Sequence, residues 1–148
     1  MFQINKEKMV GFEIKTVHNL LKRNFESSPV HKKLENLTGM QRWVIGYLSE
    51  HEGKDIFQRD LEEEFSVRRS TATGILQLME KNDLITREAV PHDARLKKLV
   101  LTPKAIEIGK MITEGIIEHE KMLCEGISQE DLDVFFKVMK QVKTNLEK

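Results

Sequence analysis

The sequence contains a single cysteine, Cys124, among its 148 residues. One cysteine excludes an intrachain disulfide framework and any metal site built from several cysteines, and it is typical of a reducing cytoplasm. Net charge is also absent, because 24 lysines and arginines balance 24 aspartates and glutamates. A hydrophobic fraction of 39% together with this charge content excludes a disordered chain and indicates one globular domain or one tight composite.

Long apolar runs are missing as well. No segment of the sequence approaches the roughly 18 consecutive apolar residues of a membrane-spanning helix. Charged residues come too early in the N-terminal sequence for a secretory signal. We therefore expect a cytoplasmic protein that has no membrane partner.

The sequence lacks the residue patterns of catalysis and of cofactor binding. It has no glycine-rich phosphate loop and no nucleophile paired with a base at a recognisable spacing, so we expect neither an enzyme nor a cofactor. One predicted helix carries Glu114, Glu118, His119 and Cys124. Because neighbouring helical residues point in different directions, a solvated face is favoured there over a metal site. The Cys124 thiol is interpreted as a small packing residue, with an oxidation sensor as the alternative.

Apolar residues recur at helical spacing over most of the chain. The spacing predicts helices over residues 6–25, 38–53, 58–65, 69–82, 103–124 and 128–146. Thr38 and Gln41 match a capping box, and the helix that they open is expected to end at Gly53. Thr102 and Pro103 are typical of an N-cap residue followed by the first residue of a helix.

Two short strands are predicted at residues 84–88 and 97–101. The segment between them, residues 89–96, contains proline and aspartate, which suit a hairpin loop. Together with the preceding helices, residues 38–104 have the order helix–helix–helix–strand–wing–strand. This order predicts a winged helix-turn-helix core in a fold that is mainly α with a small β-hairpin wing.

Long helices flank this core on both sides. We divide the chain into an N-terminal helical segment (1–37), a DNA-binding winged helix-turn-helix (38–104) and a C-terminal helical segment (105–148). A helix of about 20 residues spans about 30 Å, so the terminal helices are too long for the small core to cover their apolar faces. A homodimer that pairs the terminal helices of two chains covers these faces, and packing within one chain is the alternative.

Basic residues gather in one part of the sequence. Residues 66–104 carry eight basic and four acidic residues, an excess that suits a polyanion, with ordinary surface scatter as the alternative. In a helix-turn-helix, the N-terminal residues of the second helix meet base edges and phosphates in the major groove. We therefore expect the helix over residues 69–82 to bind double-stranded DNA. The alternative function is a winged-helix protein-interaction module without DNA binding.

The candidate DNA-binding residues lie on this helix and on the hairpin. They are Arg68, Arg69, Ser70, Thr71, Thr73, Gln77, Arg87, Asp93, Arg95, Lys97 and Lys98. Small hydroxyls allow close approach to DNA, and a helix N-terminus adds free N–H groups and partial positive charge. Capping of the helix is the alternative role of Ser70 and Thr71. Gln77 is interpreted either as an adenine contact or as a solvated residue.

The predicted wing adds two residues of opposite charge. Arg95, near the tip, suits a narrow minor groove, where the negative potential of DNA is concentrated. Phosphate would repel Asp93, so this residue is interpreted as one that orients a guanidinium through a charge-assisted hydrogen bond. A simple acidic turn residue is the alternative interpretation of Asp93.

Four runs of residues carry a resemblance to a known family, namely 69–73, 84–87, 93–95 and 99–102. They resemble the multiple-antibiotic-resistance regulator (MarR) family, and the Asp-x-Arg wing followed by Leu-Thr is the most specific part. The resemblance extends over nearly the whole chain. It implies a homodimeric transcription factor, usually a repressor, that binds a pseudo-palindromic operator and releases it when a small effector binds. Gly74 departs from the pattern, because many members carry a larger side chain there.

Overall fold

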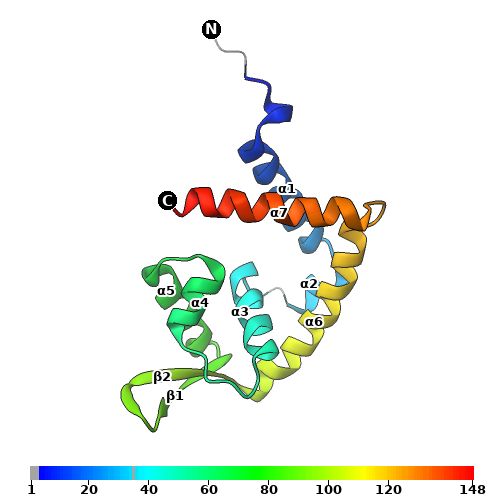
Figure 1. Cartoon of the computed structure of the whole chain (residues 1–148). Helices are drawn as coiled ribbons and strands as arrows, with labels where there is room; N and C mark the ends of the chain where they lie inside the picture. Colours follow the sequence, from blue (N-terminus) through cyan, green and yellow to red (C-terminus); the bar gives the residue numbers. More distant parts are fainter. Residues whose placement is uncertain (1–3, 35) are drawn as a thin grey trace. The chain divides into compact units, whose positions relative to one another are not determined.

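The computed structural model describes residues 4–34 and 36–148. The chain divides into two compact units, Met1–Ile112 and Thr113–Lys148. The elements are η1 (Lys6–Lys8), α1 (Val10–Glu26), α2 (Pro29–Lys33), α3 (Gly39–Glu50), α4 (Gln58–Phe65), α5 (Arg69–Lys81), β1 (Ile85–Val90), β2 (Asp93–Leu101), α6 (Pro103–Leu123) and α7 (Gln129–Leu146) (Figure 1). The predicted fold class, mainly α with one antiparallel hairpin, is confirmed. We call the hairpin of β1 and β2 the wing.

The start of α3 is the capping box that the sequence predicts. The Thr38 Oγ1 accepts a hydrogen bond from the Gln41 backbone N–H at 3.1 Å, and the Gln41 Oε1 accepts one from the Thr38 N–H at 3.2 Å. The predicted end of this helix is wrong, because α3 ends at Glu50. Gly53 lies three residues further on, at a φ of 87°. This left-handed backbone suits glycine and turns the chain away from the helix direction.

The short helix α2 is absent from the sequence prediction. The helix α1 ends at Glu26, shortly before Ser28 and Pro29. The Ser28 Oγ then accepts a hydrogen bond from the His31 N–H at 3.3 Å, and Pro29 takes the first helical position. The same two residues therefore end one helix and begin another.

The strands of the wing are longer than predicted. Their antiparallel register pairs Ile85 with Leu101, Thr86 with Val100, Arg87 with Leu99, Glu88 with Lys98, Ala89 with Lys97 and Val90 with Asp93. The loop predicted over residues 89–96 is wrong in extent, because only Pro91 and His92 lie outside the strands. Residues 94–96 have no partner in this register, since the pairing shifts before the turn in the manner of a β-bulge.

The core of the first unit lies among α3, α4, α5 and the wing. Its most deeply buried large side chains are Ile45, Leu76, Met79, Leu84 and Ile85. The helix α5 packs against α4 and β1, and α3 contacts both α5 and β2 (Figure 1). The Leu99 N–H also donates to the Ile56 carbonyl at 2.7 Å, which ties β2 to the segment before α4. These contacts hold α5 and the wing in one packed body.

Thr102 is the N-cap residue that the sequence predicts for α6. Its Oγ1 accepts a hydrogen bond from the Ala105 N–H at 3.2 Å and donates to the Asp83 carbonyl at 2.8 Å. The Thr102 residue is 7% exposed, so water cannot replace these bonds easily. One hydroxyl thus joins the end of the wing to the turn between α5 and β1.

We expect the Thr102→Val substitution to lower the free energy of unfolding by about 1–3 kcal/mol. Valine keeps the shape of threonine but leaves the Asp83 carbonyl and the Ala105 N–H without this partner. Thr102→Ser is the control, because it retains the hydroxyl and loses only a methyl group. Urea unfolding measures both variants. A Thr102→Val protein as stable as the wild type would contradict the role of this hydroxyl.

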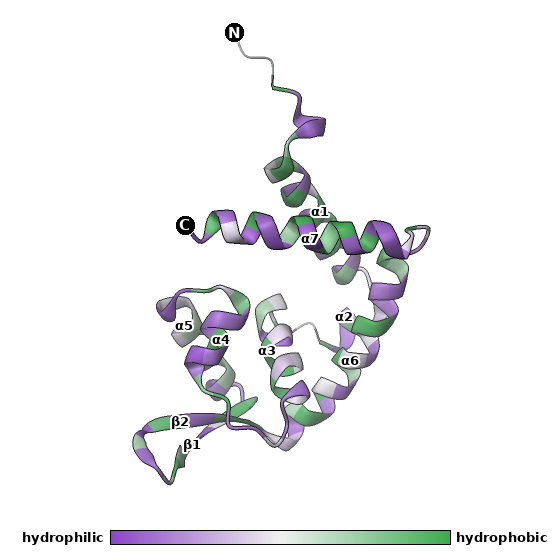
Figure 2. Cartoon of the chain, in the orientation of Figure 1, coloured by the Kyte–Doolittle hydropathy of each residue, from purple (hydrophilic) through white to green (hydrophobic). Residues whose placement is uncertain are grey.

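The second unit consists of the C-terminal part of α6 and of α7. The Ser128 Oγ accepts a hydrogen bond from the Asp131 N–H at 3.1 Å, which confirms the predicted start of α7. Hydrophobic and hydrophilic residues alternate along α7 (Figure 2), and none of its residues is buried. None of the helices within residues 4–34 and 36–148 combines the length and the hydropathy of a membrane-spanning segment.

Candidate nucleic-acid interface

The N-terminal turn of α5 is exposed and carries no side-chain cap. Arg68 occupies the N-cap position and makes no capping hydrogen bond. Ser70 and Thr71 lie inside the helix, so the alternative that they cap it is wrong. Both residues are exposed. Backbone N–H groups in the first turn of a helix have no partner within the helix, and together with the helix dipole they favour an anion.

The helix α5 presents one face to the core and another to solvent. The buried residues are Ala72, Leu76 and Met79. The exposed residues include Arg69, Ser70, Thr71, Gln77 and Lys81. This division follows the predicted helical periodicity, and Ile75 is half-buried. Gln77 is exposed, which both interpretations of this residue require.

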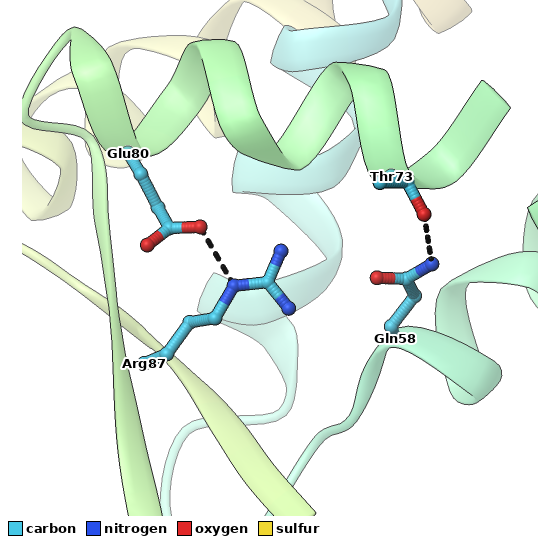
Figure 3. A network of polar contacts seen from close by, with 4 residues as sticks. All are labelled: Gln58, Thr73, Glu80 and Arg87. Atoms are coloured by element: carbon cyan, nitrogen blue, oxygen red, sulfur yellow. Dashed lines mark hydrogen bonds and ion pairs between the residues drawn. The ribbon is translucent and has the colours of Figure 1, made fainter. Parts of the chain in front are cut away.

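Thr73 lies at the boundary between these two faces. It is half-buried, and its Oγ1 accepts a hydrogen bond from the Gln58 Nε2 at 2.9 Å (Figure 3). The same amide nitrogen lies 3.4 Å from the Arg69 carbonyl oxygen. The sequence prediction missed Gln58. The only sequence feature that could have indicated Gln58 is its position as a polar residue at the start of the helix before α5.

Arg87 connects the wing to the other end of α5. Its Nε donates to the Glu80 Oε1 at 2.7 Å, and the Arg87 side chain is 27% exposed (Figure 3). The ion pair uses one of the five N–H donors of the guanidinium. Figure 3 shows the two terminal nitrogens pointing away from Glu80. Arg87, predicted as a DNA contact, is therefore also a tie between β1 and α5.

Arg95 projects from the wing into solvent, with 92% of its side chain accessible. The Asp93 Oδ1 accepts a hydrogen bond from the Arg95 backbone N–H at 2.9 Å and lies 3.4 Å from the Arg95 Nε. Aspartate thus holds both the backbone and the inner end of the guanidinium. This contact fits the interpretation of Asp93 as a residue that orients Arg95.

The two lysines of β2 differ in their surroundings. The Lys98 Nζ lies 3.6 Å from the Asp55 Oδ1 and 3.9 Å from the Glu88 Oε2, whereas Lys97 is exposed. Neighbouring residues of a strand point to opposite sides of the sheet. Two carboxylates offset the charge of Lys98, so Lys97 is the better placed of the two to attract phosphate.

The described residues contain no group of three or more histidines, cysteines, aspartates or glutamates that could hold a metal ion. Cys124 is a half-buried free thiol. The interface offers N–H and O–H donors and positive charge. Hydroxyls, an amide and Arg69 lie on α5, Arg68 is its N-cap residue, and an exposed guanidinium lies on the wing.

Gly74 lies in the middle of α5, where an added Cβ would meet nothing within 4 Å. We expect the Gly74→Ala substitution to raise the free energy of unfolding by about 0.5–1 kcal/mol, because alanine loses less backbone entropy in a helix. Gly109→Ala is the matched control in α6, since its Cβ would collide with the Ser49 hydroxyl and bring no such gain. Thermal unfolding measures both. A less stable Gly74→Ala protein would contradict the open surroundings of this position.

Comparisons with known proteins place this geometry among transcription regulators. A family profile described as MarR family matches residues 35–96. The transcription regulator MarR from Oenococcus oeni PSU-1 is 34% identical, with 92% of this chain and 99% of that chain covered and a TM-score of 0.80. No curated protein matches the sequence.

Two more distant structures share the fold. The S. aureus MepR–DNA complex is 22% identical, with 95% of this chain and 98% of that chain covered and a TM-score of 0.82. The heme sensor PefR from Streptococcus agalactiae in complex with heme is 24% identical, with 93% and 94% covered and a TM-score of 0.64. At these identities the likeness concerns the fold alone.

Proposed function

The chain belongs to the MarR family, and from this membership we propose that it is a transcription regulator that binds double-stranded DNA through α5 and the wing. The observation that carries the proposal is the exposed, uncapped first turn of α5, with Arg69, Ser70 and Thr71, on the same packed body as the exposed Arg95. Residues 38–104 are the DNA-binding part. Phosphate contacts set the affinity, and α5 together with Arg95 sets the specificity.

We propose further that the regulator is a homodimer held by its terminal helices. Neither α1 nor α7 buries any residue in the single chain. Large hydrophobic side chains are exposed on both helices, including Val10, Val17 and Leu20 on α1, and Val134, Phe135, Phe136 and Val138 on α7. Apolar surface of this extent marks an interaction site, and a second copy of the chain covers it symmetrically.

A symmetric dimer explains how a small effector would control binding. The two copies of α5 must lie about 34 Å apart, one turn of DNA, to fit successive major grooves. An effector that favours another spacing therefore releases the operator, and the protein acts as a repressor. Among proteins of this fold, MepR is seen with DNA and PefR with heme.

A salt titration tests DNA binding against a protein-interaction role. Fluorescence anisotropy with duplexes from the region upstream of the gene should show affinity that falls with salt, because bound cations are released from the phosphates. With about six phosphate contacts, the affinity should drop on the order of a thousandfold between 50 and 200 mM salt. A winged-helix module without DNA binding would show no such binding at any salt concentration.

A further inference from the structure

The amide of Gln58 joins α4 to the DNA-facing turn of α5. Its Nε2 lies 2.9 Å from the Thr73 Oγ1 and 3.4 Å from the Arg69 carbonyl oxygen (Figure 3). The amide nitrogen carries two N–H groups, so it can donate to both oxygens at once. Residues 69 and 73 are four apart and lie on one face of the helix, which explains how one amide reaches both.

These contacts decide where the Thr73 hydroxyl proton goes. A hydroxyl has one donor and two acceptor sites, and the Gln58 N–H fills an acceptor site, so the proton turns away from Gln58. A helical threonine often donates to the carbonyl four residues earlier, which here belongs to Arg69. That carbonyl accepts the helical N–H of Thr73 and faces the Gln58 amide, so both of its lone pairs are engaged. The proton is left for a partner outside the protein.

We propose that Gln58 is a positioning residue that holds the Thr73 hydroxyl as a hydrogen-bond donor to a DNA phosphate oxygen. An anionic phosphate oxygen only accepts hydrogen bonds, so it requires a donor at this point. Thr73 lies in the N-terminal half of α5, close to the N–H groups that also favour an anion. This inference rests on the proposed DNA-binding function and adds a residue outside α5 and the wing.

A double-mutant cycle in the full-length protein tests the proposal. The variants are Gln58→Ala, Thr73→Val and the double variant, measured by anisotropy on the upstream duplex and by thermal unfolding. Each single variant should weaken binding roughly threefold to tenfold, and the double variant should bind no more weakly than the weaker single one. Thr73→Ser should retain affinity. Gln141→Ala is the matched control, since its amide bonds Asn145 within α7.

A second readout distinguishes positioning from general stabilisation. Duplexes carrying a single uncharged methylphosphonate are scanned along the site with the wild type and with each variant. Methylphosphonate replacement of one phosphate per half-site should lower the affinity of the wild type. The same replacement should not lower the affinity of Gln58→Ala or Thr73→Val any further. Their melting temperatures should fall by no more than a few degrees, as expected for the loss of one half-buried hydrogen bond.

Three results would overturn the inference. They are additive losses in the cycle, wild-type affinity of Gln58→Ala, and a methylphosphonate profile that the variants leave unchanged. If the wild-type protein bound none of the duplexes, the proposed function itself would fall, and the inference with it. If the wild type bound the duplex and Gln58→Ala bound it with the same affinity, the inference would fall but the proposed function would stand.

Discussion

Replacement of Leu76 by alanine is expected to lower the free energy of unfolding by about 2–5 kcal/mol, the largest effect that we predict for one substitution. The Leu76 side chain is 1% exposed and lies on the face of α5 that packs into the core. Truncation removes buried methyl groups and leaves a cavity that the surrounding helices cannot fill completely. Urea unfolding measures the loss.

Leu78 provides the matched control for this variant. It lies in the same helix, two residues further on, and is 51% exposed. Leu78→Ala should change the free energy of unfolding by no more than about 0.5 kcal/mol, because the exposed Leu78 side chain makes few packing contacts that truncation could remove. Equal losses in the two variants would contradict the orientation of α5, and with it the choice of residues that face DNA.

Replacement of Arg95 by alanine is expected to weaken operator binding by about 1–3 kcal/mol. Arg95 projects from the wing with 92% of its side chain exposed, and Asp93 holds its backbone and its Nε. The substitution removes a planar guanidinium suited to a narrow minor groove. Its effect on the free energy of unfolding should be small, because the side chain packs against little else.

Two further variants separate the roles of shape and charge at Arg95. Arg95→Lys retains the charge but loses the planar donor array, so it should recover only part of the affinity if the residue enters a groove. Lys110→Ala removes one positive charge from α6 and should leave affinity close to that of the wild type. Unaltered operator affinity of Arg95→Ala would exclude a role for this residue in DNA binding.

Local patterns predicted the helices of the core and their beginnings. Helix caps join residues that are only three apart, as Thr38 and Gln41 or Thr102 and Ala105 show. Such short-range pairs can be recognised directly in the sequence. The short helix α2 was missed because five residues are too few to show a helical period. The strands of the wing were predicted too short because Pro91 indicates a turn but not how far pairing extends on either side.

The contacts that position the interface were beyond the reach of sequence patterns. Gln58 and Thr73 are 15 residues apart, and they meet only because α4 packs against α5. Glu80 and Arg87 lie on a helix and on a strand, so no single period relates them. The sequence predicts which residue types gather near DNA, whereas the tertiary structure decides which of their donors are already engaged within the protein.

Hydroxyl-radical footprinting on the region upstream of the gene shows whether two copies of α5 bind the same duplex. We expect protected stretches about one helical turn apart, or about 10 base pairs, arranged symmetrically around the centre of an inverted repeat. This pattern requires two copies of α5 in successive major grooves. A single protected stretch, or no protection at protein concentrations that saturate dimer formation, would contradict DNA binding by a symmetric dimer through α5.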